Sequence, residues 1–90
     1  METNEVFEEL KFYLTADPEN EVPEERGMGL NPDEVTMDAK LEEDLEIDSL
    51  GKVEIIMWAE DFFKIDEIDD EDFQGVDTVE QAVKLLHSKL

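Results

Sequence analysis

Residues 48–63 decide the fold of this chain, and their sequence is DSLGKVEIIMWAEDFF. Successive residues of an α-helix are turned by about 100°, so each apolar residue of this segment can be assigned to a face. One face is a continuous apolar stripe, which is expected to be buried and consists of Ile55, Ile56, Ala59, Phe62 and Phe63. Asp48 has a side chain of the kind that caps the start of a helix. The segment therefore predicts a helix from about Ser49 to Phe63.

The opposite face of this helix carries a second row at spacings of 4, 3 and 4, namely Leu50, Glu54, Met57 and Asp61. Isolated apolar residues on a protein surface are ordinary and need no function. The same row also suits a small docking face, because its two apolar residues supply contact area and its two acids attract a basic partner. The row alone leaves both interpretations open.

Three further helices are predicted around this segment. Residues 4–15 carry a helical stripe, with Thr3 or Asn4 as N-cap and Phe12 partly exposed; the stripe is Val6, Phe7, Leu10, Tyr13 and Leu14. A short helix near 70–74 carries Phe73. The last helix begins at residues 77–80, where the acidic Asp77 precedes Glu80 in the manner of a capping box. Its buried stripe is expected to be Val79, Ala82, Val83 and Leu86.

The remaining segments are predicted to be loops. Residues 17–33 are rich in Pro, Gly and Glu, which indicates a long loop that Met28 and Leu30 pin to the core. Residues 34–47 are expected to be partly extended, with a turn at 41–45. No strand is expected. The fold class is therefore all-α: a single domain over residues 1–90, built as a small four-helix bundle of three main helices and one short helix, with a long loop after the first helix.

The composition excludes several classes of function. The 90 residues include 28 acidic and 7 basic ones, giving a net charge of −21, and 40% are hydrophobic, enough for a modest core. Such a surface repels nucleic acid and anionic membranes and attracts basic protein patches. The absence of cysteine excludes disulfides, thiolate metal sites and a catalytic thiol. Because neither a membrane span nor a signal peptide is recognisable, we expect a cytoplasmic protein.

Ser49 is the most informative polar residue, because it is expected in the first turn of the helix. Backbone N–H groups and the positive end of the helix dipole favour a phosphate there, although Asp48 and Ser49 also suit simple capping. The one histidine, His87, lies near the end of the last helix, so Ser49 has no evident base for nucleophilic catalysis. The acidic run 66–72 lacks the ligand spacing of an EF-hand, and no metal site is predicted. We therefore expect no enzyme activity.

Taken together, these features resemble the acyl carrier protein family. The resemblance covers residues 34–90 well and the first helix more loosely. It rests on Glu34-Val35-Thr36, on Leu41-Glu42-Glu43-Asp44-Leu45, on the motif Asp48-Ser49-Leu50 followed by Val53, Glu54 and Met57, and on Asp77-Thr78-Val79.

The resemblance implies a specific chemistry. Ser49 is implied as the residue to which a phosphopantetheinyl transferase attaches 4′-phosphopantetheine from coenzyme A with Mg²⁺, with Asp48 supporting the motif. The thiol of this group carries acyl chains as thioesters. The implied docking surface for the transferase and for acyl-transferring, synthase and reductase enzymes with basic patches is Leu50, Glu54, Met57, Glu60 and Asp61. A pocket for the acyl chain is implied, lined by Ile55, Ala59 and Phe63. A monomer suits a carrier that visits several partners.

Four positions depart from the family pattern. Glu46 stands where the family usually has Gly, so we expect a different backbone path before Ser49. Gly51 lowers helix propensity, and Lys52 is expected to place a positive charge beside Ser49. Trp58 replaces a residue that is usually small and is expected to reshape the acyl pocket. These changes favour a specialised carrier over generic fatty-acid synthesis.

Two alternatives to a freestanding acyl carrier are considered. An aminoacyl or peptidyl carrier uses the same serine chemistry. An acidic interaction protein that mimics nucleic acid accounts for the net charge of −21 but assigns no role to the row beside Ser49.

Overall fold

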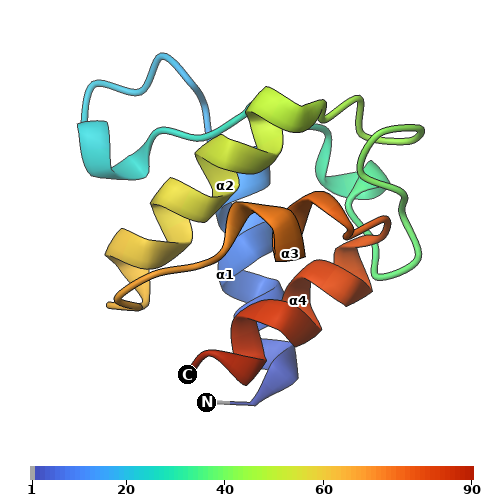
Figure 1. The fold of residues 1–90 in the computed structure, drawn as a ribbon. Coiled ribbons are helices and arrows are strands. Elements are labelled where there is room, and N and C mark those ends of the chain that lie inside the picture. Colours follow the sequence, from blue (N-terminus) through green and yellow to red (C-terminus); the bar gives the residue numbers. More distant parts are fainter. Residues whose placement is uncertain (1) are drawn as a thin grey trace.

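The structure is a computed structural model that describes residues 2–90 (Figure 1). These residues form the helices α1 (Thr3–Thr15), α2 (Ser49–Phe62), α3 (Asp70–Gln74) and α4 (Val79–Ser88), and the short 3-10 turns Pro23–Glu25 and Pro32–Glu34. No strand occurs among them, and a single antiparallel bridge pairs Lys40 with Thr78. The predicted all-α fold of three main helices and one short helix is confirmed.

One hydrophobic core joins all the helices of the described chain. Of the stripe predicted in the first helix, three residues are fully buried, Val6, Leu10 and Leu14. The stripe predicted for the last helix is buried throughout, and so is Phe73 of α3. The loop between α1 and α2 adds Val35, Leu41, Leu45 and Ile47. The apolar periodicity therefore located most of the core, and Phe12 is exposed as expected.

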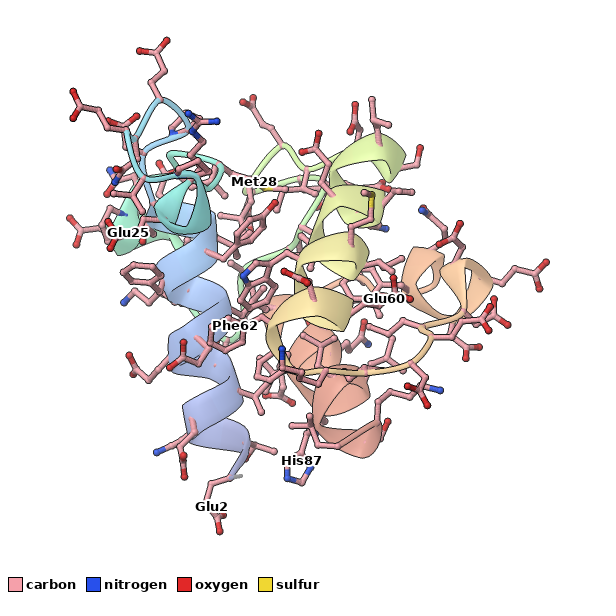
Figure 2. All side chains as sticks on the ribbon, turned by 90° about the vertical axis from the view of Figure 1, so that its left-hand side faces the viewer. Glu2, Glu25, Met28, Glu60, Phe62 and His87 are labelled. Carbon is pink, nitrogen blue, oxygen red and sulfur yellow. The ribbon has the colours of Figure 1, made fainter. Side chains whose placement is uncertain are left out.

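A stack of aromatic rings lies between α1 and α2. The Trp58 ring lies 4.8 Å from the Tyr13 ring and 5.3 Å from the Phe62 ring, between centroids, with interplanar angles of 14° and 23°. Figure 2 shows Phe62 in this region between the two helices. The expectation that Phe62 lies in the core is wrong: the residue is 47% exposed and packs on Trp58 at the end of α2. Burial, and secondarily the charge of Glu54, raise the pKa of the Tyr13 hydroxyl.

The N-caps of two helices differ from the prediction by one or two residues. Glu2, and neither Thr3 nor Asn4, is the N-cap of α1, and its backbone N–H donates to the Glu5 carboxylate at 3.5 Å. At α4, Thr78 replaces the expected Asp77 as the cap. In a capping box, the side chain three residues after the cap bonds back to the cap. Here that side chain belongs to Gln81, three residues after Thr78, and not to Glu80.

The α4 cap is a complete capping box. The Gln81 backbone N–H donates to Thr78 Oγ1 at 3.3 Å, and the Thr78 backbone N–H donates to Gln81 Oε1 at 3.3 Å. The Asp77 backbone N–H donates to the same Gln81 oxygen at 2.7 Å. The carbonyl of Asp77 is used elsewhere, because it accepts the backbone N–H of Leu41 at 2.8 Å.

The long loop after α1 folds back on the end of that helix. Three backbone N–H groups donate to carbonyls of its last residues, from Met28 to Tyr13 at 3.2 Å, Gly29 to Ala16 at 2.7 Å and Leu30 to Leu14 at 2.8 Å. Met28 and Leu30 are partly buried against the core, as predicted. A Cβ at Gly27 would lie 1.8 Å from the carbonyl oxygen of Tyr13, so this close approach requires glycine.

Within residues 2–90, no helix combines the length and apolar character needed to span a bilayer.

The net charge of −21 predicts a stability that depends on salt. Repulsion among the carboxylates weakens the compact state, and about 0.1 M salt reduces the screening length to about 10 Å. We therefore expect the Tm, measured by circular dichroism, to rise by at least several degrees between about 0.01 M and 0.5 M NaCl. Choline chloride at equal ionic strength is the control for specific Na⁺ binding and should give the same rise. An unchanged Tm would contradict this prediction.

Candidate functional site

Ser49 is the first residue of α2 and is exposed. Asp48 is the N-cap, as predicted, and its Oδ1 accepts the backbone N–H of Gly51 at 2.9 Å. Across residues 2–90, the Ser49 hydroxyl makes no hydrogen bond with another residue. Capping is therefore done by Asp48 alone, and the Ser49 oxygen is available to an incoming reagent.

A tight turn over residues 41–45 presents Ser49, as predicted. The Leu45 backbone N–H donates to the Lys40 carbonyl at 3.1 Å, and the Ile47 backbone N–H donates to the Leu41 carbonyl at 2.8 Å. The side chains of Leu41, Leu45 and Ile47 are buried beneath the turn. Apolar burial and backbone hydrogen bonds thus set the position at which the chain enters α2.

Glu46 adopts a left-handed backbone conformation in this turn, with φ of +57°. Glycine is the residue that favours this region, since it has no Cβ to clash with the backbone. Glu46 thus takes a backbone conformation in which glycine would also fit, and the expected difference in loop path stays a prediction. The fold accommodates Glu at some conformational strain.

Gly51 has a packing role that its helix propensity does not reveal. A Cβ at this position would lie 2.8 Å from Cγ2 of the buried Ile47. The absence of a side chain at Gly51 therefore allows Ile47 to pack closely against the first turn of α2.

Lys52 is buried, and its positive charge is paired within the fold; the expectation that this charge lies beside Ser49 stays a prediction. Only 3% of Lys52 is exposed; its Nζ lies 3.3 Å from Glu42 Oε1 and donates to the Gln74 carbonyl at 3.2 Å. The helical spacing contained the signal, since Lys52 precedes Ile55 by three residues and Ile56 by four, on the same stripe. Its ammonium joins the loop, α2 and the end of α3.

Gln74 makes a second connection between α3 and the start of α2. Its side-chain Nε2 donates to the Ser49 carbonyl at 3.2 Å. No local pattern predicted this contact, because the two residues are 25 positions apart. Together with the Lys52 contact, it holds the end of α3 against the turn that carries Ser49.

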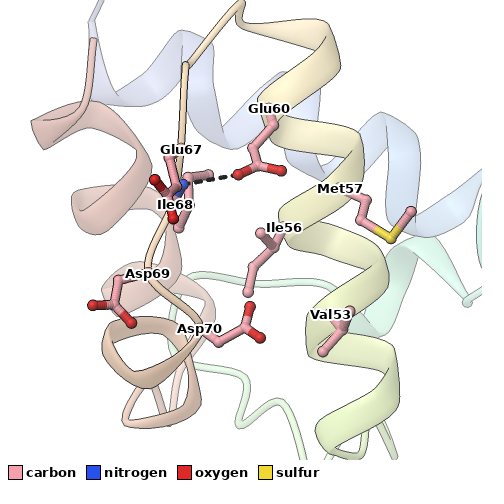
Figure 3. A pocket seen from close by; sticks show the side chains of 8 residues that line it. All are labelled: Val53, Ile56, Met57, Glu60, Glu67, Ile68, Asp69 and Asp70. Carbon is pink, nitrogen blue, oxygen red and sulfur yellow. Dashed lines mark hydrogen bonds between the residues drawn. The ribbon is translucent and has the colours of Figure 1, made fainter.

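The row predicted on α2 faces solvent. Leu50 is 68% and Met57 is 63% exposed, and Glu54 and Asp61 are exposed as well. Glu60 differs from them, because it is partly buried and its Oε2 accepts the backbone N–H of Ile68 at 2.9 Å (Figure 3). Four of the five predicted docking residues are therefore exposed to a partner, whereas Glu60 also holds the segment before α3 in place.

A cavity of about 440 Å³ lies between α2 and the segment leading into α3 (Figure 3). Its walls combine apolar and acidic side chains, namely Val53, Ile56, Met57, Glu60, Glu67, Ile68, Asp69 and Asp70. The residues predicted for an acyl pocket lie elsewhere on α2 and just after it: Ile55 and Ala59 are fully buried, and Phe63 is partly buried. Trp58, expected to reshape that pocket, stacks on Tyr13 of α1.

A second cavity of about 410 Å³ surrounds the start of α2 and is lined by Glu42, Glu46, Ile47, Asp48 and Ser49. Ser49 thus stands in an open hollow where a bulky group can be attached to its hydroxyl without displacing the core. In the part of the chain that the structure describes, no cluster of three or more acidic or histidine side chains is arranged to hold a metal ion.

Comparison with known proteins identifies the family. The family model described as the phosphopantetheine attachment site matches residues 26–86. The chain belongs to the acyl carrier protein family. It is 43% identical over 63 residues to the acyl carrier protein of Petrotoga mobilis, covering 70% of this chain and 73% of that protein. It is 40% identical over 62 residues to that of Chlorobium phaeobacteroides, covering 69% and 78%.

Membership of the family settles the general role of the chain. It is a carrier and not an enzyme, and its cofactor is 4′-phosphopantetheine. It interacts with a transferase and with biosynthetic enzymes. The open hollow around Ser49 fits such a group, because the hydroxyl is accessible and lies at the start of a helix, where phosphate is favoured.

The close packing at Gly51 predicts that alanine is harmful there. Gly51→Ala gains helix propensity of up to about 1 kcal/mol, but the new methyl group overlaps Ile47. We expect a net loss of about 1–2 kcal/mol in the free energy of unfolding, measured by urea titration. Gly75→Ala is the control, since a Cβ there would meet its nearest atom at 3.7 Å and is expected to be neutral or slightly stabilising. Equal effects of the two substitutions would contradict this prediction.

Proposed function

We propose that Ser49 is the residue that receives 4′-phosphopantetheine and that the chain is a freestanding acyl carrier. The observation that carries this proposal is the position of Ser49, exposed at the first turn of α2 in an open hollow, within the residues matched by the attachment-site family. The other serine, Ser88, lies outside the matched residues at the end of α4. Asp48 supports Ser49 by capping α2.

In this reaction Ser49 is a substrate of the transferase. Its Oγ forms a bond to the phosphorus of coenzyme A that bears the pantetheine, the bond from this phosphorus to the adenosine bisphosphate part breaks, and the hydroxyl proton leaves to a base of the transferase. The described residues offer no hydrogen-bonded base to Ser49, which accords with a base supplied by the partner. Once attached, the group supplies the thiol that this cysteine-free chain lacks.

The docking surface proposed for the partner enzymes is the exposed row on α2, extended by Glu60. Leu50 and Met57 offer apolar contact area, and Glu54 and Asp61 attract basic side chains. The row runs along the same helix that begins with Ser49, so an enzyme seated on it lies next to the attachment site. The acidic surface of the whole chain adds long-range attraction for such basic partners.

We also propose that the acyl chain is sheltered next to Ile55, Ala59 and Phe63. Ile55 and Ala59 are fully buried, so the acyl chain must displace core side chains to reach them. The cavity between α2 and α3 is lined by Ile56, the residue next to Ile55 in the chain. Trp58 fills the opposite side, against α1. This arrangement favours a carrier specialised for particular acyl groups.

The single-domain organisation over residues 1–90, the monomeric state and the cytoplasmic location stay predictions. The names of the curated relatives favour an acyl cargo over an aminoacyl or peptidyl one.

The attachment site is tested by the mass of the intact chain after incubation with coenzyme A, Mg²⁺ and a broad-specificity phosphopantetheinyl transferase. We expect the unsubstituted chain and Ser88→Ala to gain one phosphopantetheinyl group and Ser49→Ala to gain none. Circular dichroism should show the same helix content in the unsubstituted chain and in Ser49→Ala, because the Ser49 hydroxyl makes no hydrogen bond within residues 2–90. Modification of Ser49→Ala would show that the group is attached elsewhere.

The docking surface is tested by charge reversal. Glu54→Lys with Asp61→Lys should raise the KM of the transferase for the carrier by about tenfold at low salt, because two attractive charges become repulsive. The control pair, Glu8→Lys with Glu19→Lys, changes the net charge equally at exposed positions on α1 and the following loop. If the control pair raises KM as much, the attraction is general and the row has no special role.

A further inference from the structure

Two residues other than glycine have left-handed backbone conformations, Glu46 with φ of +57° and Lys64 with φ of +58°, among residues 2–90. A residue with a Cβ is disfavoured in this region, so each of these positions needs a reason.

The conformation of Lys64 follows from the way α2 ends. Phe63 is the C-cap, Lys64 is the next residue, and the Ile65 backbone N–H donates to the Glu60 carbonyl at 3.0 Å. This is the hydrogen bond by which helices commonly end through a left-handed residue. The positive charge of Lys64 also suits the negative end of the helix dipole. The residue type at position 64 therefore serves the fold.

The fold does not explain the residue type at position 46. The turn needs a left-handed backbone there, since it brings the Ile47 backbone N–H to the Leu41 carbonyl at 2.8 Å, but glycine meets this need with less strain. The Glu46 side chain is exposed and makes no hydrogen bond or ion pair with another residue of the described chain. No interaction of its carboxylate within the fold therefore offsets the backbone strain.

The Glu46 side chain lines the same cavity as Ser49. Glu42 and Asp48 also line this cavity, but their carboxylates have internal partners: Glu42 lies 3.3 Å from Lys52 Nζ, and Asp48 accepts the Gly51 N–H at 2.9 Å. Glu46 is thus the carboxylate beside Ser49 that is left for an external partner. An enzyme that reaches the Ser49 hydroxyl must also cover the Glu46 carboxylate.

We propose that Glu46 is a specificity-determining residue that pairs with a lysine or arginine of the phosphopantetheinyl transferase. This inference rests on the proposed attachment at Ser49. Coenzyme A brings negative phosphates to a cavity that already holds an unpaired carboxylate, and their repulsion opposes the reaction unless the enzyme supplies a cation there. A transferase with such a cation is selected, and one without it is disfavoured.

Four forms of the carrier test this proposal: the unsubstituted chain, Glu46→Gln, Glu46→Gly and the matched control Lys64→Gly. A transferase that modifies the unsubstituted chain is supplied with coenzyme A and saturating Mg²⁺, and KM for the carrier and kcat are measured at low and high NaCl. We expect both Glu46 variants to raise KM by roughly five- to tenfold at low salt with kcat unchanged, and high salt to remove most of the difference. Lys64→Gly should behave like the unsubstituted chain.

The Tm of each form separates charge from strain. Glu46→Gly should raise Tm by a few degrees, and Lys64→Gly should raise it less, because that variant also loses a charge that suits the helix dipole. Glu46→Gln should leave Tm nearly unchanged. The proposal is overturned if Glu46→Gln is modified as efficiently as the unsubstituted carrier. It is also overturned if only Glu46→Gly is defective, or if the defect of Glu46→Gln comes with a lower Tm. A higher Mg²⁺ requirement with unchanged KM overturns it in favour of a metal ligand. Failure of every transferase to modify Ser49 in the unsubstituted chain defeats the proposed function itself, and this inference with it.

Discussion

The structure depends on a set of backbone hydrogen bonds between the loop before α2 and the start of α4. Leu41 donates to the Asp77 carbonyl at 2.8 Å, and Val79 and Glu80 donate to the carbonyls of Ala39 and Met37 at 3.0 and 2.9 Å. The first N–H groups of a helix have no partner within the helix, so the loop satisfies donors that α4 leaves open. In return, α4 holds the loop at the point where it must turn toward Ser49. The cavity around Ser49 is therefore positioned by a helix that contributes no residue to it.

Lys52 extends this positioning to α3. A buried ammonium needs partners because its desolvation is unfavourable, and here they come from Glu42 in the loop and the Gln74 carbonyl at the end of α3. Gln74 in turn donates to the Ser49 carbonyl. In a chain of net charge −21, an internal cation also offsets part of the surrounding negative potential. The segment that presents Ser49 is thus held from both sides, by α4 and by α3.

The local patterns of the sequence predicted the elements well and the long-range polar contacts poorly. The stripe Val6, Leu10 and Leu14 and the N-cap Asp48 depend on residues three or four positions apart, and the structure confirms both. Phe62 satisfied the same periodicity but is the last residue of α2 and lies half-exposed on Trp58. Lys52 was not included in the predicted core stripe, although its position on the helix lies in that stripe.

By itself, the sequence determined the all-α class, the helix that begins at Ser49, the exposed row along that helix and the family, because each depends on local spacing or on a short motif. The tertiary structure alone decided that the Lys52 ammonium meets Glu42 and the Gln74 carbonyl, that Gln74 reaches Ser49 and that Gly51 makes room for Ile47. It also decided that Glu46 takes the conformation typical of glycine beside Ser49. The physical reason is that these features arise from contacts between segments distant in sequence and from the close packing of a small core, which no local pattern encodes.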